Sequence, residues 1–112
     1  MYNSKEIEEK IKLKNQTIIA SIIDPLTKKT IKFNIINEHT LWRAQTFYTK
    51  EPITIKWIRS FQKNEIFFDI GANIGQFTIF AGIISKCQIF AFEPESNNFQ
   101  GLNKNILINN LN

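Results

Sequence analysis

The chain has 112 residues, which allows one small domain at most. Hydrophobic residues make up 43% of it and charged residues 21%, values that exclude disorder throughout. The net charge of +4 comes from 14 basic and 10 acidic side chains scattered along the chain, which argues against a nucleic-acid-binding face. The N-terminus is charged where a signal peptide would be apolar, and no apolar run is long enough to cross a membrane. We therefore expect a cytoplasmic protein that binds neither nucleic acid nor membrane.

The first 37 residues are expected to form an extension of the main domain. A weak helical pattern to about Lys14 predicts a surface helix or a frayed arm. Two β-rich runs, 17–23 and 30–35, surround a turn that contains Pro25, and the second run alternates strictly between apolar and polar residues. This pattern predicts a β-hairpin that decorates or caps the main fold, with the domain boundary between residues 37 and 38.

Residues 41–61 lead into the main domain. The stretch 41–48 is expected to be a short helix or an irregular segment, and a helix over about 52–61 follows, because proline is well tolerated in a first helical turn. An apolar stripe at helical spacing indicates core packing of this helix; it consists of Ile55, Trp57, Ile58 and Phe61. Glu51, directly before the helix, is either a helix cap or a residue that faces a ligand.

From residue 66 onwards the pattern alternates between strand and helix. Residues 66–70 and 88–92 are predicted to be strands, 77–84 a buried helix, and a last helix is expected to begin near Ser96. Two parallel strands joined by a crossover helix form a βαβ unit, the building block of doubly wound folds. The predicted fold class is therefore α/β, Rossmann-like, with an N-terminal β-hairpin extension.

A glycine-bracketed turn follows the first of these strands. Gly71 and Gly75 are separated by three residues, so the Gly-x-Gly-x-x-Gly fingerprint of dinucleotide-binding enzymes is not met. Asp69, just ahead of the turn, would repel a pyrophosphate but suits the cationic end of S-adenosylmethionine. Glu93 ends the second strand, where nucleotide-binding α/β folds place an acceptor for ribose hydroxyls. Together these residues predict a site for S-adenosylmethionine.

The single cysteine and the single histidine carry no chemistry in this interpretation. Cys87 cannot form an internal disulfide, which agrees with a reducing compartment, and it is expected to be an inert core residue. His39 has no metal-ligating neighbours at useful spacing, so we expect a surface histidine and no metal site.

The residues 69–75, followed by Phe92-Glu93-Pro94 and then by Asn98, Leu102 and Asn105, resemble the FkbM family of class I methyltransferases. In that family asparagine replaces the usual third glycine of the first motif, as Asn73 does here, and the segment 41–52 is similar to the family's entry into the domain. The resemblance covers about residues 38–111.

The resemblance implies roles for the matching positions. The methionine and ribose end of the cofactor would be lined by Asp69, Gly71, Ala72, Asn73 and Gly75. Glu93 would accept hydrogen bonds from the ribose hydroxyls, and Pro94 would shape the loop beneath the adenine. Asn98 either lies near the adenosine or is a polar residue at a helix N-terminus.

The resemblance also implies a larger domain than residues 38–112 supply. We expect an α/β fold truncated after the second strand–helix unit, with bare apolar surface on its two strands. No residue is a convincing general base, so the catalytic residues are not assigned. The predicted function is that of an N-terminal fragment of an S-adenosylmethionine-dependent methyltransferase, inactive alone, that acts on a hydroxyl of a sugar or secondary metabolite. Its partners would be a small-molecule or glycan acceptor and the missing C-terminal half of the domain.

Two alternatives stay open at this point. The chain could be a non-catalytic remnant that binds cofactor weakly or mediates protein contacts. It could also be an NAD-type dinucleotide-binding domain, although that function would require the missing glycine and no Asp69.

Overall fold

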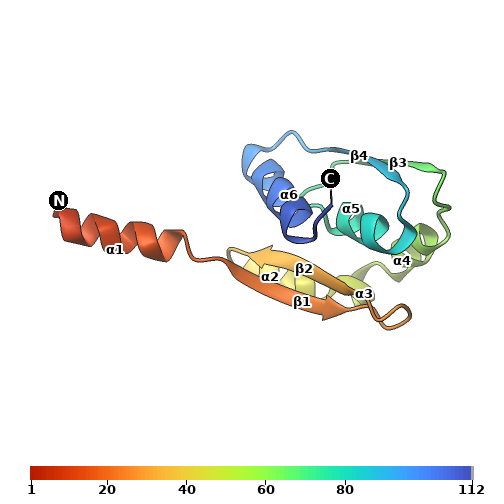
Figure 1. Ribbon diagram of the computed structural model, residues 1–112, viewed down its shortest axis with the longest axis horizontal. Coiled ribbons are helices and arrows are strands. Elements are labelled where there is room, and N and C mark those ends of the chain that lie inside the picture. Colours follow the sequence, from red (N-terminus) through yellow and green to blue (C-terminus); the bar gives the residue numbers. More distant parts are fainter. Residues whose placement is uncertain (112) are drawn as a thin grey trace.

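The computed structural model describes residues 1–111, in which helices and strands alternate along the chain (Figure 1). In chain order the elements are α1 (Ser4–Lys14), β1 (Ile18–Ile23), β2 (Thr30–Ile35), α2 (Glu38–Gln45), α3 (Phe47–Lys50), α4 (Pro52–Arg59), β3 (Ile66–Ile70), α5 (Gln76–Phe80), a π-helical turn η1 (Ala81–Ser85), β4 (Gln88–Phe92) and α6 (Ser96–Ile108).

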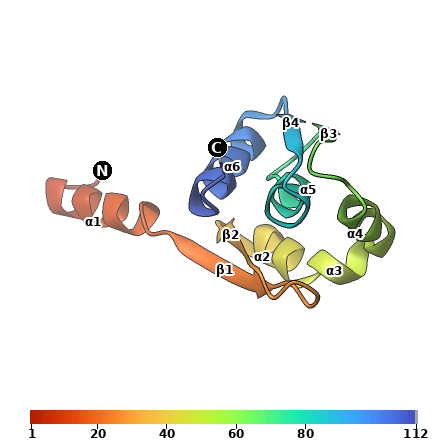
Figure 2. The same ribbon diagram turned by 45° about the vertical axis from the view of Figure 1, so that its right-hand side comes forward.

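The strands of the described residues form two separate pairs. β1 and β2 are antiparallel, with Ile18 opposite Ile35, whereas β3 and β4 are parallel, with Phe67 opposite Ile89. In both views α5 and α6 lie between the two strand pairs, and α1 projects away from the body (Figures 1 and 2). The α/β class, the hairpin and the parallel strand pair are therefore confirmed.

A single core connects the hairpin with the helices and β3. Its aromatic centre is Phe47, whose ring centroid lies 5.7 Å from that of Phe33 on β2 and 5.3 Å from that of Phe80 on α5. Ile31 and Phe33 of the hairpin are buried in the same core as Ile58 of α4. The hairpin thus caps the main fold, which was one of its two predicted roles. The domain boundary after residue 37 remains a prediction.

A buried ion pair fixes the hairpin turn to the helices. The Asp24 carboxylate is fully buried and accepts hydrogen bonds from the Thr27 amide (2.9 Å) and from the Tyr48 hydroxyl (2.9 Å). Both terminal nitrogens of the Arg59 guanidinium also donate to it, and the guanidinium lies over the Phe80 ring. Arg59 holds the pKa of Asp24 well below its usual range, and burial together with Asp24 raises the pKa of Tyr48.

The free edge of β2 is covered by two asparagines, Asn105 of α6 and Asn109, the C-cap of that helix. Asn105 accepts a hydrogen bond from the Asn34 amide (2.8 Å), and Asn109 both accepts from the Lys32 amide (2.9 Å) and donates to the Lys32 carbonyl (2.8 Å). Their spacing of four residues places both side chains on one helix face, opposite alternate residues of the strand. Side-chain amides therefore take the place of a neighbouring strand at this edge.

The predicted helix 77–84 is confirmed, although it is an α-helix only as far as Phe80. η1 then widens the turn, because the Lys86 amide donates to the carbonyl of Ala81, five residues earlier (2.9 Å). One local expectation is wrong. Trp57 is 57% exposed rather than part of the core. Its ring makes T-shaped contacts with the rings of Phe61 and Phe67.

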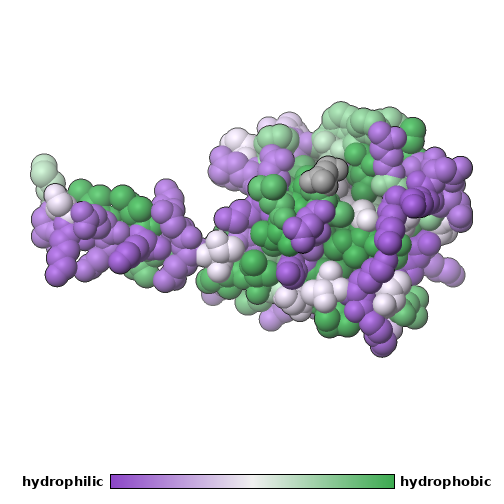
Figure 3. Space-filling view, in the orientation of Figure 1, coloured by the Kyte–Doolittle hydropathy of each residue, from purple (hydrophilic) through white to green (hydrophobic). Residues whose placement is uncertain are grey.

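One face of the β3–β4 sheet is bare, as expected for two strands of a larger sheet. Alternate residues point away from α5 and α6 and are 42–74% exposed: Ile66, Phe68, Ile70, Phe90 and Phe92. The Phe68 ring stacks on that of Phe90, with 5.5 Å between centroids. The space-filling view shows apolar atoms along this margin of the molecule (Figure 3). An exposed apolar patch of this kind is typical of an interaction surface.

α1 makes no buried contact with the body. Every one of its residues is exposed, and a capping box between Asn3 and Glu6 fixes its first turn. This agrees with the predicted surface helix. Among residues 1–111, neither α1 nor any other helix combines the length and apolar character needed to span a bilayer.

Candidate functional site

The loop between β3 and α5 adopts a left-handed backbone at three of its five positions. Gly71, Asn73 and Gly75 have φ angles of +74°, +58° and +86°. Glycine tolerates this region without cost, and asparagine is among the few other residues enriched in it. The asparagine between the two glycines therefore fits the same backbone requirement that a third glycine would meet.

Glu93 joins the end of β4 to this loop. Its Oε1 accepts a hydrogen bond from the Asn73 amide (2.8 Å), and its Oε2 accepts one from the Glu95 amide (3.0 Å). The Phe92 carbonyl accepts two more bonds from the loop, from the amides of Gly71 and Ala72 (both 2.9 Å). The predicted ribose acceptor is thus also an anchor of the loop, a role that sequence reasoning did not assign to it.

α6 holds the other end of the loop. Asn105, only 1% exposed, donates from Nδ2 to the Ile74 carbonyl (2.7 Å) while its Oδ1 accepts from the hairpin. Leu102 packs against Gly75 so closely that a Cβ added to Gly75 would lie 2.4 Å from its Cδ1 atom. The loop is therefore preformed by contacts with β4 and α6.

Asp69 is turned toward α5. The Thr78 hydroxyl, itself buried, donates to Asp69 Oδ2 at 2.5 Å. Burial raises the pKa of Asp69, and the hydrogen bonds from Thr78 oppose part of that rise. Asp69 does not line the cavity beside the loop. Its predicted contact with the cofactor stays a prediction, and its observed contact links β3 to α5.

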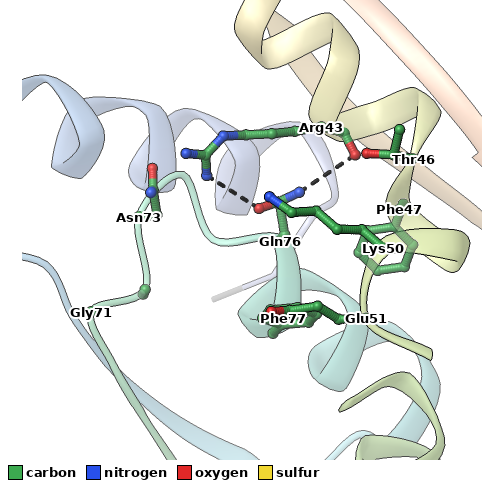
Figure 4. Close-up of a pocket in the computed structure, with 10 residues that line it drawn as sticks. Arg43, Thr46, Phe47, Lys50, Glu51, Gly71, Asn73, Gln76 and Phe77 are labelled. Atoms are coloured by element: carbon green, nitrogen blue, oxygen red, sulfur yellow. Dashed lines mark hydrogen bonds between the residues drawn. The ribbon is translucent and has the colours of Figure 1, made fainter. Parts of the chain in front are cut away.

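A cavity of about 280 Å³ lies between the loop and helices α2 and α3 (Figure 4). Gly71, Ala72 and Asn73 line one side of it. The opposite side carries charged and polar groups from α2, α3 and the start of α4 and α5; they include Arg43, Lys50, Glu51 and Gln76. The Arg43 guanidinium donates to Gln76 Oε1 (3.3 Å), and Gln76 Nε2 donates back to the Arg43 carbonyl (3.4 Å).

Glu51 lines the cavity and does not cap α4. It occupies the N-cap position, but its side chain accepts no capping hydrogen bond. Of the two roles left open for Glu51, the side-chain cap is absent, and the role of facing a ligand stays a prediction. Lys50 places its ammonium over the Trp42 ring, 4.4 Å from the centroid. The lining of the cavity therefore includes two cations and one carboxylate.

The structure brings most predicted site residues to one end of the β3–β4 sheet, but not into one cavity. Gly71, Ala72 and Asn73 line the cavity beside the loop, whereas Asn98 lines a second groove between α2 and α6. Three further predicted residues, Gly75, Glu93 and Pro94, line neither of these. Asn98 is also the residue whose amide receives the Glu95 cap of α6 (2.7 Å), so its helix N-terminal position is confirmed.

Sequence reasoning missed the charged wall of the cavity. Arg43, Lys50 and Gln76 lie on three separate helices and belong to no common local pattern. The one signal for this region was the resemblance of the segment 41–52 to the FkbM family's entry into the domain. Cys87 is buried and burial raises the pKa of its thiol, as expected of an inert core residue. Residues 1–111 contain no cluster of three or more potential metal ligands.

Comparison with known proteins gives one similarity to report. No family model matches the chain, and no solved structure matches it. Over 95 residues the chain is 23% identical to the hexuronic acid methyltransferase AglP of Haloferax volcanii. The match covers 85% of this chain and 39% of that protein, so the chain spans well under half the length of this relative. The similarity is distant and suggests a methyltransferase.

Proposed function

We propose that this chain is the cofactor-binding part of an S-adenosylmethionine-dependent methyltransferase of the FkbM type. The observation that carries the proposal is the junction of the 71–75 loop with Glu93, which joins the ends of two parallel strands beside a cavity with both signs of charge. Ligands of open α/β sheets bind beyond the carboxyl ends of the strands, where this junction lies. The distant similarity to a methyltransferase supports the same conclusion.

The charged wall of the cavity fits the amino-acid end of the cofactor. S-adenosylmethionine carries a carboxylate and an ammonium on one carbon, so it needs a cation and an anion close together. Lys50 supplies positive charge for the carboxylate, and Glu51 supplies a carboxylate for the ammonium. On the loop side of the cavity, Gly71 has no side chain and Ala72 has only a methyl group, so a ligand can approach the backbone there.

Glu93 retains the capacity to bind ribose while it anchors the loop. An ionised carboxylate offers about four lone-pair sites, and each Glu93 oxygen uses one for a backbone amide. The remaining sites can accept the two ribose hydroxyls. The loop anchor and the ribose acceptor are thus one group, which couples the shape of the loop to the bound sugar.

A dinucleotide is disfavoured by the same geometry. The loop lacks the second glycine of the dinucleotide fingerprint, and α5 is an α-helix for only five residues. The Glu93 carboxylate also occupies the Asn73 amide of the loop (2.8 Å), and its negative charge would repel a pyrophosphate placed there. NAD binding is therefore the alternative to be tested and not the proposal.

The proposed acceptor is a carbohydrate. The relative in Haloferax volcanii is described as acting on a hexuronic acid, which supports a sugar acceptor that carries a carboxylate. Transfer would proceed by in-line attack of an acceptor oxygen on the sulfonium methyl, with S-adenosylhomocysteine as the leaving group. Such a reaction depends mainly on positioning. No residue of 1–111 is assigned as the base that removes the acceptor proton.

The bare face of the β3–β4 sheet supports the proposal that the active enzyme contains more structure than these residues. A methyltransferase domain of the proposed type has further strands and helices that would cover Phe68, Phe90 and Phe92. We therefore propose that the missing half of the domain is a partner of this surface. A remnant that mediates protein contacts would use the same face.

Calorimetric titration with S-adenosylhomocysteine and with NAD tests the cofactor assignment. We expect S-adenosylhomocysteine to bind and NAD to bind at least tenfold more weakly. Binding of NAD alone would refute the assignment. A chain that binds neither would support the non-catalytic alternative.

A thermodynamic cycle separates the two roles of Glu93. Glu93→Gln keeps one acceptor oxygen but weakens both the anchor and the ribose contact, so loss of affinity alone does not identify the role. The variant and the wild type should each be titrated with S-adenosylhomocysteine and with its 2′-deoxy analogue. If Glu93 contacts the ribose, Glu93→Gln should weaken binding of S-adenosylhomocysteine about tenfold more than it weakens binding of the deoxy analogue. This ratio corresponds to one charged hydrogen bond. Equal losses for both ligands would assign Glu93 to the loop alone.

A further inference from the structure

A second groove adjoins the cofactor cavity and has a different chemistry. It has a volume of about 370 Å³ and lies between α2, the end of the hairpin and the first half of α6, whose labels are visible in Figure 2. The two hollows share Arg43 and Asn73. A molecule in the groove would therefore lie beside the loop that forms the proposed cofactor site.

The lining of the groove is polar and carries no acidic side chain. Amide side chains predominate, among them Asn34, Asn98 and Gln100. The hydrogen bonds that Asn34 and Asn98 make come from their backbone amides. Within residues 1–111, the side-chain amides of all three residues have no protein partner. An amide offers both a donor and an acceptor, the combination that suits vicinal sugar hydroxyls.

The charge of the groove selects an anion. Arg43 and Lys104 stand on opposite walls, on α2 and α6, and His39 lies one turn before Arg43. Arg43 uses one guanidinium nitrogen for Gln76 and has no acidic partner among the described residues. Its planar fork can therefore take a carboxylate with two parallel hydrogen bonds. The long contact of Lys104 with the Thr17 hydroxyl, at 3.5 Å, leaves its ammonium available.

We infer that this groove binds the acidic sugar of the acceptor, with Arg43 and Lys104 holding its carboxylate and Asn98 and Gln100 its hydroxyls. The inference rests on the proposed function, because that function makes the bound sugar the methyl acceptor. It places specificity for the acceptor on α2 and α6, next to the cofactor loop. A neutral hexose would leave the two cations without a partner and should bind more weakly.

The test is a chemical-shift titration of the isotope-labelled chain with D-glucuronate, with D-glucose and with acetate at constant ionic strength. Glucuronate should shift the amide signals of Gln100, Gly101 and Lys104, whereas glucose and acetate should shift them only at concentrations about tenfold higher. Lys104→Gln should raise the dissociation constant for glucuronate about three- to fivefold, the effect of one exposed ion pair. Arg43→Gln should raise it about tenfold, as expected for a bidentate partner.

The matched control is Lys56→Gln, because Lys56 is an exposed lysine of α4 that lines neither hollow. It should leave glucuronate binding unchanged. Lys104 does not line the cofactor cavity, so Lys104→Gln should also leave binding of S-adenosylhomocysteine unchanged. Equal shifts with glucuronate and acetate, or an equal effect of Lys104→Gln and Lys56→Gln, would overturn the inference.

The two proposals fail in different ways. A chain that binds S-adenosylhomocysteine but not glucuronate retains the proposed function and loses the groove assignment. A chain that binds glucuronate in the groove but no S-adenosylhomocysteine retains the sugar site and loses the methyltransferase function.

Discussion

Asn105 is the residue on which the fold and the candidate site depend together. It is buried, and its one side chain closes two hydrogen bonds, to the Ile74 carbonyl of the loop (2.7 Å) and from the Asn34 amide of the hairpin (2.8 Å). Asn105→Ala would leave both backbone groups without a partner. Each such buried group costs about 1–3 kcal/mol, so the free energy of unfolding should fall by about 2–6 kcal/mol. This is a large part of the stability of a small domain.

A second substitution separates the two bonds. Asn105→Asp keeps the acceptor for the Asn34 amide but removes the donor to the Ile74 carbonyl and places a negative charge beside it. The loop should then lose its hydrogen bond to α6 while the hairpin keeps its contact. We expect affinity for S-adenosylhomocysteine to fall about tenfold in this variant, because the loop would no longer be preformed for the ligand.

The matched control is Asn103→Ala, on the same helix. Asn103 is exposed and bonds only to the Phe99 carbonyl of its own helix, so the change in stability should stay within about 0.5 kcal/mol. Urea unfolding followed by circular dichroism measures the stability of all three variants, and calorimetry measures the affinity. If Asn105→Ala cost no more than Asn103→Ala, the argument that Asn105 joins loop and hairpin would be refuted.

Two further predictions concern the ion pair of the hairpin turn and the glycines of the loop. Because Arg59 depresses the pKa of Asp24, the contribution of this carboxylate to stability is present above its unfolded pKa of about 4 and is lost as the pH falls through the lower folded value. The difference in unfolding free energy between wild type and Asp24→Asn should thus shrink between pH 5 and the lowest accessible pH, roughly 2. A constant difference would contradict the assignment. The control is Glu8→Gln, because Glu8 is an exposed acid of α1. Gly75→Ala should destabilise the chain by about 2–4 kcal/mol, since φ is +86° and the new methyl would collide with Leu102. Gly71→Ala should cost only about 1–2 kcal/mol, because φ is +74° but no atom lies within 4 Å; equal losses in thermal or urea unfolding would show that Leu102 yields freely.

Local patterns were sufficient to predict the elements whose signals lie within a few residues. Strict alternation in 30–35 predicted β2, and the apolar runs on either side of the glycine turn predicted the parallel pair β3 and β4. The π-helical turn was not predictable in this way, because η1 continues the apolar pattern of α5 and differs from it only in the spacing of its hydrogen bonds.

The candidate site was predictable only where it is contiguous in sequence. Gly71, Asn73 and Gly75 form one motif, and their left-handed backbone explains why these residue types occur there. Arg43 and Gln76 meet across 33 residues, and Asn105 reaches Ile74 across 31, so no window of sequence contains either contact. Long-range partners of this kind depend on how helices pack, which single-sequence patterns do not encode.

The loop has packing and hydrogen-bond partners on both sides within residues 1–111, whereas the sheet that carries it is covered on one face. The loop is held at Asn73 by Glu93, at Ile74 by Asn105 and at Gly75 by Leu102; Glu93 directly follows β4, and the other two partners belong to α6. The opposite face of the same sheet has no cover over Phe68 or Phe92. Cofactor affinity depends on the preformed loop, whereas turnover also requires an acceptor fixed in line with the methyl group. The proposed function therefore predicts that the two properties separate: residues 1–111 bind S-adenosylhomocysteine, whereas methyl transfer requires a further element over the bare face.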